Sequence, residues 1–161
     1  MNLVIANRQR TKKINTRRLK QVVAELLIEL QIKEAELGIK LVEAKEMARM
    51  NRQFLQHEGS TDVITFDSTE KRKAESGTRK NIHGEFFICV DDAVKQANEF
   101  KTIWQAEVVR YVIHGVLHLL GYDDLKPQLR RRMKREENRL MRRMENRFTL
   151  AQLSHAAKMS A

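Results

Sequence analysis

Cysteine and proline are almost absent from this chain of 161 residues, which has one of each. A single cysteine excludes an internal disulfide framework and is typical of proteins from a reducing compartment. No stretch approaches the roughly 18 apolar residues that a membrane-spanning helix needs, and the N-terminus lacks the apolar segment of a signal peptide. We therefore expect a soluble, cytoplasmic protein that does not bind membranes.

Hydrophobic residues make up 42% and charged residues 32% of the chain, which indicates a globular rather than a disordered protein. The length suffices for one domain with its own hydrophobic core. We expect this domain to span residues 1–147. The remaining residues, 148–161, are weakly patterned, and we interpret them as a C-terminal tail compatible with disorder.

The net charge of +10 is unevenly distributed. Residues 1–20 hold seven Lys or Arg and no acid, and residues 126–147 hold ten basic and three acidic residues. Basic segments of this size attract polyanions, and phosphate contacts dominate nucleic-acid binding. The alternative is a solvated helix face with internal pairs such as Arg132–Glu136. The excess of base is too large for mutual neutralisation, so we favour a nucleic acid as the partner.

The hydrophobic pattern predicts four strands and five main helices. Short apolar runs predict strands over residues 3–6, 39–42, 62–66 and 85–90, and longer patterns predict helices over 15 or 16 to 30, 44–55, about 91–100, 103–120 and 127–148. The polar segment 67–83 is predicted to be a flexible loop. This order indicates an α/β (α+β) fold, with a single mixed four-stranded sheet packed by about five helices.

The run from His114 to Asp124, HGVLHLLGYDD, has the spacing of a metal site. Residues four apart on a helix project from one face, so His114 and His118 can aim two imidazole nitrogens at one point. Gly121 can end the helix in a left-handed turn, which can bring Asp123 or Asp124 back toward the histidines. Two His and one carboxylate around a divalent ion leave a position for water, as in catalytic zinc sites.

The helix that carries the two histidines is apolar on nearly every side, which predicts a metal site on a central buried helix. An unpaired buried polar group costs roughly 1–3 kcal/mol, and one ion would satisfy both imidazoles. Gly115 costs about 1 kcal/mol relative to Ala in a helix interior, which indicates a close backbone approach or room beside the metal. A buried helix that merely carries two histidines is the alternative.

A related spacing occurs in zinc peptidases, where a Glu follows the first His, and a Gly and a third His stand at offsets seven and ten. Here Gly115 replaces that Glu, which is the general base of a peptidase, and Asp124 replaces the third His. The basic flanks are also not what a peptidase needs. We therefore disfavour a metallopeptidase.

The motif resembles the signature of the YbeY family of bacterial rRNA-maturation endoribonucleases, H-G-x-L-H-x-x-G-Y-D-H. Asn51–Arg52 and Thr61–Phe66 look like the family's N-R segment and P-T-D-V-L-S-F strand, and Gly84–Cys89 is similar to its G-D-I-x-I-C strand. The resemblance implies a metal-dependent endoribonuclease, specific for single strands. It would act in 16S rRNA 3′-end maturation and ribosome quality control, with rRNA and small-subunit ribosomal proteins as partners.

Carried over residue by residue, the resemblance implies that His114, His118 and Asp124 bind one Zn²⁺ ion. Asp124 stands where the family has a third His; a carboxylate is an acceptable zinc ligand but weakens Lewis acidity. These ligands also suit nickel, manganese or iron. Asp123 keeps the family's Asp position and could orient an imidazole N–H. Glu85, at the acidic position of the G-D-I strand, is with Asp123 a candidate catalytic residue.

Two other positions depart from the family pattern. Leu55 stands where the family carries an Arg, six residues before Thr61, and Ser60 stands where it carries a Pro. A cation for the phosphate must therefore come from Arg52, Lys80 or the basic last helix. Leu55 and Asp124 together keep a second function open, a non-catalytic ribosome-associated RNA-binding factor with a structural zinc.

Overall fold

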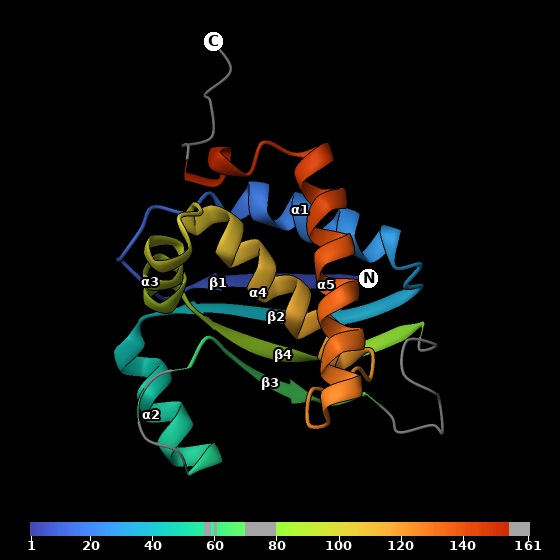
Figure 1. Cartoon of the computed structure of the whole chain (residues 1–161), viewed down its shortest axis with the longest axis horizontal. Helices are drawn as coiled ribbons and strands as arrows, with labels where there is room; N and C mark the ends of the chain where they lie inside the picture. The colour runs from blue at the N-terminus through green and yellow to red at the C-terminus, as the bar shows by residue number, and fades with distance from the viewer. Residues whose placement is uncertain (57–58, 60, 70–79, 155–161) are drawn as a thin grey trace.

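The computed structural model describes residues 1–56, 59, 61–69 and 80–154. Their elements are, in chain order, β1 (Asn2–Asn7), α1 (Thr16–Glu29), β2 (Glu34–Val42), α2 (Ala44–Leu55), β3 (Val63–Asp67), β4 (Asn81–Cys89), α3 (Val90–Phe100), α4 (Trp104–Leu119), α5 (Pro127–Arg147) and a 3-10 helix, η1 (Leu150–Ser154). Figure 1 shows this arrangement. The predicted order of strands and main helices is confirmed.

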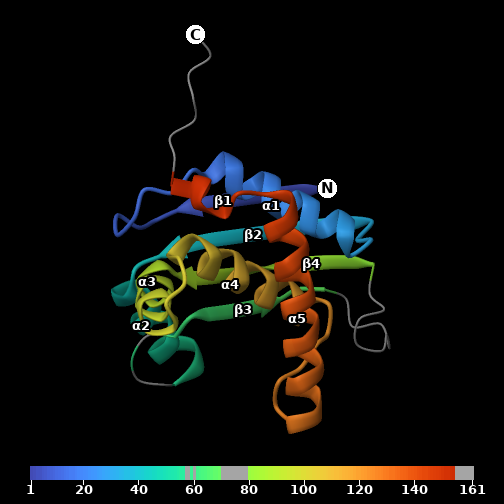
Figure 2. The same cartoon turned by 45° about the horizontal axis from the view of Figure 1, so that its top comes forward.

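One mixed sheet contains all four strands, in the order β1-β2-β4-β3 (Figures 1 and 2). β1 is parallel to β2 and β2 to β4, whereas β3 is antiparallel to β4. Parallel neighbours need a crossover connection, and α1 makes the one between β1 and β2. The predicted fold, a mixed four-stranded sheet with five helices, is therefore confirmed.

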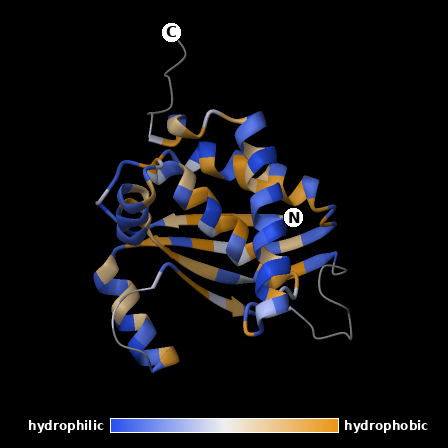
Figure 3. Cartoon of the chain, viewed as in Figure 1, coloured by the Kyte–Doolittle hydropathy of each residue, from blue (hydrophilic) through white to orange (hydrophobic). Residues whose placement is uncertain are grey.

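The two faces of the sheet have different cores. The larger core lies between one face and α1, α4 and α5, and the smaller core lies on the other face beneath α2. Successive residues of a strand point to opposite faces, so in β4 Phe86 belongs to the larger core and Phe87 to the smaller one. Figure 3 shows that α5 is hydrophilic along most of its visible side, whereas the strands behind it are largely hydrophobic.

The helix starts agree with the sequence signals. α1 begins after Asn15, whose side chain caps the helix by accepting a hydrogen bond from the backbone N–H of Arg18 at 3.1 Å. Pro127 occupies the first turn of α5, where its missing N–H has no cost. None of the helices among the described residues is both long and apolar enough to cross a membrane.

Two strands are longer than predicted. β2 begins at Glu34 rather than after Gly38, and β4 begins at Asn81 rather than Glu85, because the two strands pair in register from Glu34–Asn81 to Val42–Cys89. Their first halves looked like loop because one side of each is exposed and polar. The predicted loop 67–83 is correspondingly shorter, and its residues 70–79 lie outside the described residues.

The beginning of the predicted tail is packed rather than disordered. Leu150 and Leu153, in η1, are both buried, and the backbone N–H of Asn15 donates to the carbonyl of Leu153 at 2.7 Å. Apolar side chains in this turn cover the start of α1, next to which η1 lies in both views (Figures 1 and 2). Residues 155–161 lie outside the described residues.

Candidate metal centre

Helix α4 is fixed against the sheet by a contact that only glycine permits. A Cβ built on Gly115 would lie 2.8 Å from Cγ of the Phe86 ring, which is itself fully buried in β4. The expected close approach at Gly115 is therefore present. It holds α4 in place while His114 and His118, on either side of the glycine, keep 27% and 26% of their side chains exposed.

The chain reverses direction immediately after α4. Gly121 has a φ of +98°, in the left-handed region that favours glycine. The backbone N–H of Tyr122 donates to the carbonyl of Leu117 at 3.0 Å and closes the turn. This is the predicted role of Gly121, and it returns Asp124 to the face of α4 that carries the histidines.

Three potential ligand atoms meet at this turn. The Nε2 atoms of His114 and His118 lie 3.1 Å apart, and Oδ2 of Asp124 lies 3.9 Å from the first and 3.7 Å from the second. A triangle with these sides has a point about 2.1 Å from every corner, the length of a zinc bond to nitrogen or oxygen. The structure thus brings the three predicted ligands together in an arrangement that fits one divalent ion.

The second nitrogen of each imidazole also has a partner. Nδ1 of His114 lies 3.2 Å from Oε2 of Glu137, and Nδ1 of His118 lies 3.2 Å from the carbonyl oxygen of Tyr122. When Nδ1–H donates to an oxygen, the lone pair of Nε2 is left for a metal, as in most protein sites with histidine ligands. Both histidines are therefore held in the tautomer that metal binding requires.

The two histidines differ in basicity. Burial lowers the pKa of His114, but the hydrogen bond and charge of Glu137, with Asp62 and Asp124, outweigh it and raise the pKa above its ordinary value. Burial and the neighbouring His114 lower the pKa of His118. His118 therefore stays neutral more readily, and His114 is the ligand for which protons compete most strongly with a metal.

Glu137, on α5, was missed from the sequence. It is 5% exposed and accepts hydrogen bonds from His114 and from Nη1 of Arg110, the latter at 3.0 Å. Burial alone would raise its pKa, but these two donors lower it, so the carboxylate is ionised. The available signal was its spacing, four residues after Met133 and three before Leu140, which places an acid among the core-facing positions of α5.

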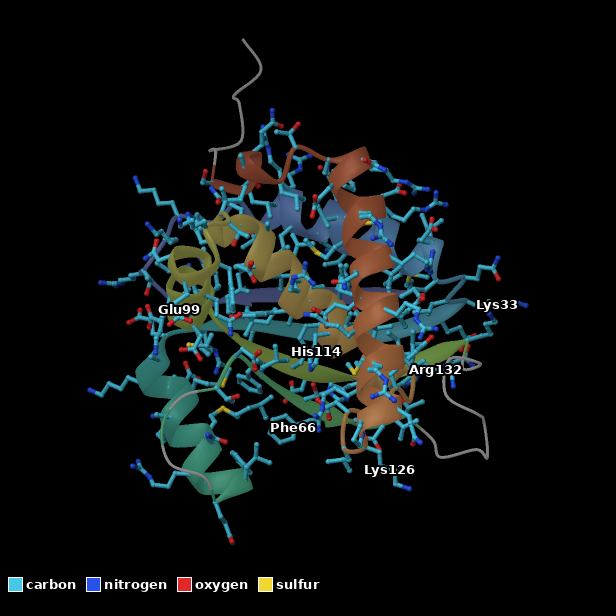
Figure 4. All side chains as sticks on the ribbon, in the orientation of Figure 1. Lys33, Phe66, Glu99, His114, Lys126 and Arg132 are labelled. Carbon is cyan, nitrogen blue, oxygen red and sulfur yellow. The ribbon has the colours of Figure 1, made fainter. Side chains whose placement is uncertain are left out.

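A cavity of about 320 Å³ opens beside these groups, between α4 and α5. Its charged lining consists of three carboxylates and three cations besides His114: Asp62, Asp124, Glu137, Arg110, Arg130 and Lys134. Figure 4 shows His114 beside α5, with Arg132 on the N-terminal half of that helix and Lys126 just before its start. Two of the three predicted ligands, His114 and Asp124, thus line a cavity together with bases of the last helix.

The two candidate catalytic carboxylates, Glu85 and Asp123, lie in different parts of the structure. Glu85 shares the sheet face of Phe87, opposite His114, and its Oε2 lies 3.3 Å from Nζ of Lys40. Asp123 is in the turn, but its Oδ1 accepts the backbone N–H of Leu125 at 2.9 Å, and both imidazoles have other partners. The structure therefore brings neither carboxylate into a hydrogen bond with the histidines.

Only some of the candidate cations lie near the histidines. Leu55 is the last residue of α2, 45% exposed, and neither Arg52 nor Lys80 lines the cavity that contains His114. Of the predicted sources, the basic last helix supplies Arg130 and Lys134. Arg110 of α4, which sequence reasoning did not single out, adds a third cation.

Comparisons with known proteins agree with the motif. A family model described as "Endoribonuclease YbeY" matches residues 4–145. Two curated proteins of that name, from Chlorobium phaeovibrioides and Syntrophotalea carbinolica, are 37% identical over 125 residues and 33% identical over 146 residues. These matches cover 78% of this chain and 79% of the first relative, and 89% of this chain and 96% of the second.

The fold has a solved counterpart. A solution structure of a Thermotoga maritima protein superposes with a TM-score of 0.67 and 23% identity, covering 98% of this chain and 97% of that one. At this identity the likeness concerns the fold, whereas the family model and the curated relatives establish the sequence relationship. The resemblance predicted from the motif is confirmed, and the chain belongs to the endoribonuclease YbeY family.

Proposed function

We propose that this chain is a metal-dependent endoribonuclease that cleaves single-stranded RNA, with one zinc ion held by His114, His118 and Asp124. The observation that carries the proposal is the convergence of three ligand atoms on one point beside a cavity whose lining includes three basic residues. When bound, zinc supplies Lewis acidity, which activates water and polarises a phosphoryl oxygen.

The chain's own residues position the reacting groups. Glu137 and the carbonyl of Tyr122 hold the two imidazoles, and Gly115 leaves the helix without the acid that a peptidase would use. A proton released by the attacking group needs an acceptor in the cavity. Of the cavity's carboxylates, Asp62 is neither a proposed metal ligand nor hydrogen-bonded to His114, so we assign this role to it rather than to Glu85 or Asp123.

The biological substrate that fits best is ribosomal RNA. Support comes from the family, whose curated members are named endoribonucleases, and from the net charge of +10, which favours a polyanion. The proposed role is 16S rRNA 3′-end maturation and ribosome quality control in the cytoplasm, where small-subunit ribosomal proteins would be partners.

The proposal is tested by incubating the zinc-loaded protein with single-stranded and with double-stranded RNA, with and without chelator. We expect cleavage of the single strand only, loss of cleavage with chelator, recovery on adding zinc, and no cleavage by His114→Ala. His83→Ala is a matched control, because His83 lies in β4 with 43% of its side chain exposed and does not line the cavity of His114.

A non-catalytic RNA-binding factor with a structural zinc is the second candidate, and the exposed Leu55 in place of the family's Arg favours it. In that case the metal-loaded protein would bind RNA tightly and in a salt-dependent manner, yet no preparation would cleave it. This outcome would contradict the nuclease proposal.

A further inference from the structure

The cations of the His114 cavity come from two facing helices. Arg110 lies four residues before His114 on α4, so both project from one face of that helix. Arg130 and Lys134 are likewise four residues apart on α5. All three line the cavity together with His114 and Asp124, so they surround the space in front of the proposed metal ligands.

Each of these cations has a partner in the protein and also retains N–H donors for a ligand. Both hydrogen bonds of Arg110, to Glu137 and to Asn138 at 3.0 Å, use Nη1 alone. Arg130 uses Nε to bond the backbone carbonyl of Asp124 at 3.2 Å. A guanidinium carries five N–H donors in a fixed fork, so each arginine retains donors for an anion. Lys134 lies 3.5 Å from Glu137 and is otherwise mostly exposed.

The charge balance favours an anionic ligand once a metal is present. Three carboxylates and three cations line the cavity, so their formal charges cancel. A divalent ion bound by neutral imidazoles and Asp124 leaves two positive charges in a partly enclosed space. Opposite charge is attracted more strongly there than in bulk water, because the local dielectric is lower.

A buried hydroxyl gives independent evidence for a ligand. Tyr111 is 2% exposed and lines the same cavity, and among the described residues its hydroxyl has no hydrogen-bond partner. Burial raises its pKa, so it remains an O–H donor at neutral pH. An unpaired buried donor costs free energy, which an oxygen of a bound ligand, directly or through water, would recover.

Three other bases of α5 have a different role. Arg139, Arg143 and Arg147 form ion pairs with Glu29, at 3.5, 2.8 and 3.2 Å, and so fasten α5 to α1. They are therefore engaged in packing two helices together. Arg130 and Lys134 instead border the cavity from the N-terminal half of α5. This end of the helix extends past β3 in Figure 2.

From these observations we propose that Arg110, Arg130, Lys134 and the Tyr111 hydroxyl form a subsite for one phosphodiester of single-stranded RNA, directly beside the metal ligands. The subsite supplies positive charge in place of the Arg that the family carries at the position of Leu55. The inference rests on the proposed function in its choice of RNA, but it concerns binding and is tested without cleavage.

The test measures the Kd of the full-length, zinc-loaded protein for a fluorescent 2′-O-methyl single-stranded oligonucleotide at several salt concentrations. The variant is Arg130→Gln with Lys134→Gln, both exposed, so the fold is retained. Each phosphate contact on a single strand contributes about 0.7 to the slope of log Kd against log salt. Because the proposed subsite holds one phosphodiester, we expect the slope to fall by about 0.7, with binding weakened about tenfold at low salt.

Arg135→Gln with Arg142→Gln is the matched control, because both residues are exposed on α5 and neither lines the His114 cavity. We expect its salt slope to remain close to that of the wild type. An equal loss in both double variants would overturn the subsite, because charge alone would then explain the binding. A selective loss in a protein that does not cleave RNA would uphold the subsite and refute only the nuclease.

Tyr111→Phe tests the hydroxyl separately, since it keeps the ring in the core. We expect unchanged or higher thermal stability, because an unpaired donor is removed, together with roughly tenfold weaker oligonucleotide binding. Binding equal to that of the wild type would exclude the hydroxyl from the subsite.

Discussion

At the scale of single residues, Glu137 controls how His114 faces the proposed metal. Its carboxylate accepts from Nδ1 of His114 and from Arg110, and it is almost fully buried on a helix that is otherwise rich in bases. Acceptors of this kind fix the tautomer and raise the basicity of a histidine ligand. The geometry of the site therefore depends on a residue that is not a ligand.

Glu137→Ala should lower zinc affinity by about 10–100-fold, the usual effect of removing the hydrogen-bond partner of a histidine ligand. Glu137→Gln, which keeps an acceptor oxygen, should lose less. Competition with a chromophoric chelator measures both affinities. Glu136→Gln is the control, because Glu136 pairs with Arg139 at the surface; unchanged affinity in Glu137→Ala would show that His114 does not need this carboxylate.

The pH dependence of zinc binding should also report on Glu137. The pKa of His114 is raised, so this imidazole takes up a proton, and loses its metal, at a higher pH than an unperturbed histidine as the pH falls. Glu137→Gln removes the negative charge, so the midpoint of the fall in its zinc affinity, taken relative to its own affinity at neutral pH, should lie at lower pH. Zinc titrations across the acidic range measure this midpoint, and identical midpoints in both proteins would contradict the assignment.

Cys89 should be inert in the folded protein. Burial raises its pKa to about 12, so at pH 8 only about one thiol in ten thousand is the reactive thiolate. We expect no alkylation by iodoacetamide at pH 8 until denaturant unfolds the chain, as followed by mass spectrometry. Rapid alkylation of the native protein would show that the strand end at Cys89 opens.

At the scale of elements, the metal helix depends on its contact with β4. Gly115→Ala adds a Cβ 2.8 Å from the Phe86 ring. Overpacking of this kind costs about 1–3 kcal/mol, against a gain of about 1 kcal/mol from helix propensity. We therefore expect lower stability in urea unfolding, and recovery when Phe86→Leu is combined with it; a more stable Gly115→Ala protein would refute the contact.

Local sequence patterns predicted some features of the site and not others. The histidine pair, Gly121 and Asp124 lie within eleven residues, so local helix and turn geometry sufficed to bring them together. Glu137 and Arg110 are 27 residues apart and meet only because α5 packs on α4, which no local pattern encodes. Glu85 lies on the sheet face opposite His114, because side chains alternate along β4 and Phe86, its neighbour, faces α4.

At the scale of the whole molecule, the positive charge divides between structure and binding. Part of the charge of α5 pairs with Glu25 and Glu29 and holds the helix on α1, while its N-terminal half borders the cavity of His114. The net charge of +10 predicted a polyanionic partner but could not separate these two uses, because the separation depends on which acids face each base. The larger core holds α1, α4 and α5 on one side of the sheet. It therefore fixes the histidines of α4 relative to the cavity residues of α5.

The central claim is that one metal ion is held by His114, His118 and Asp124. Elemental analysis combined with X-ray absorption spectroscopy, on protein purified without a metal-binding tag, tests it most directly. The account predicts one zinc ion per chain, coordinated by two histidine nitrogens and further oxygens without sulfur, and lost from His118→Ala. A chain that stays metal-free when zinc is supplied, or whose zinc survives His118→Ala, would contradict it.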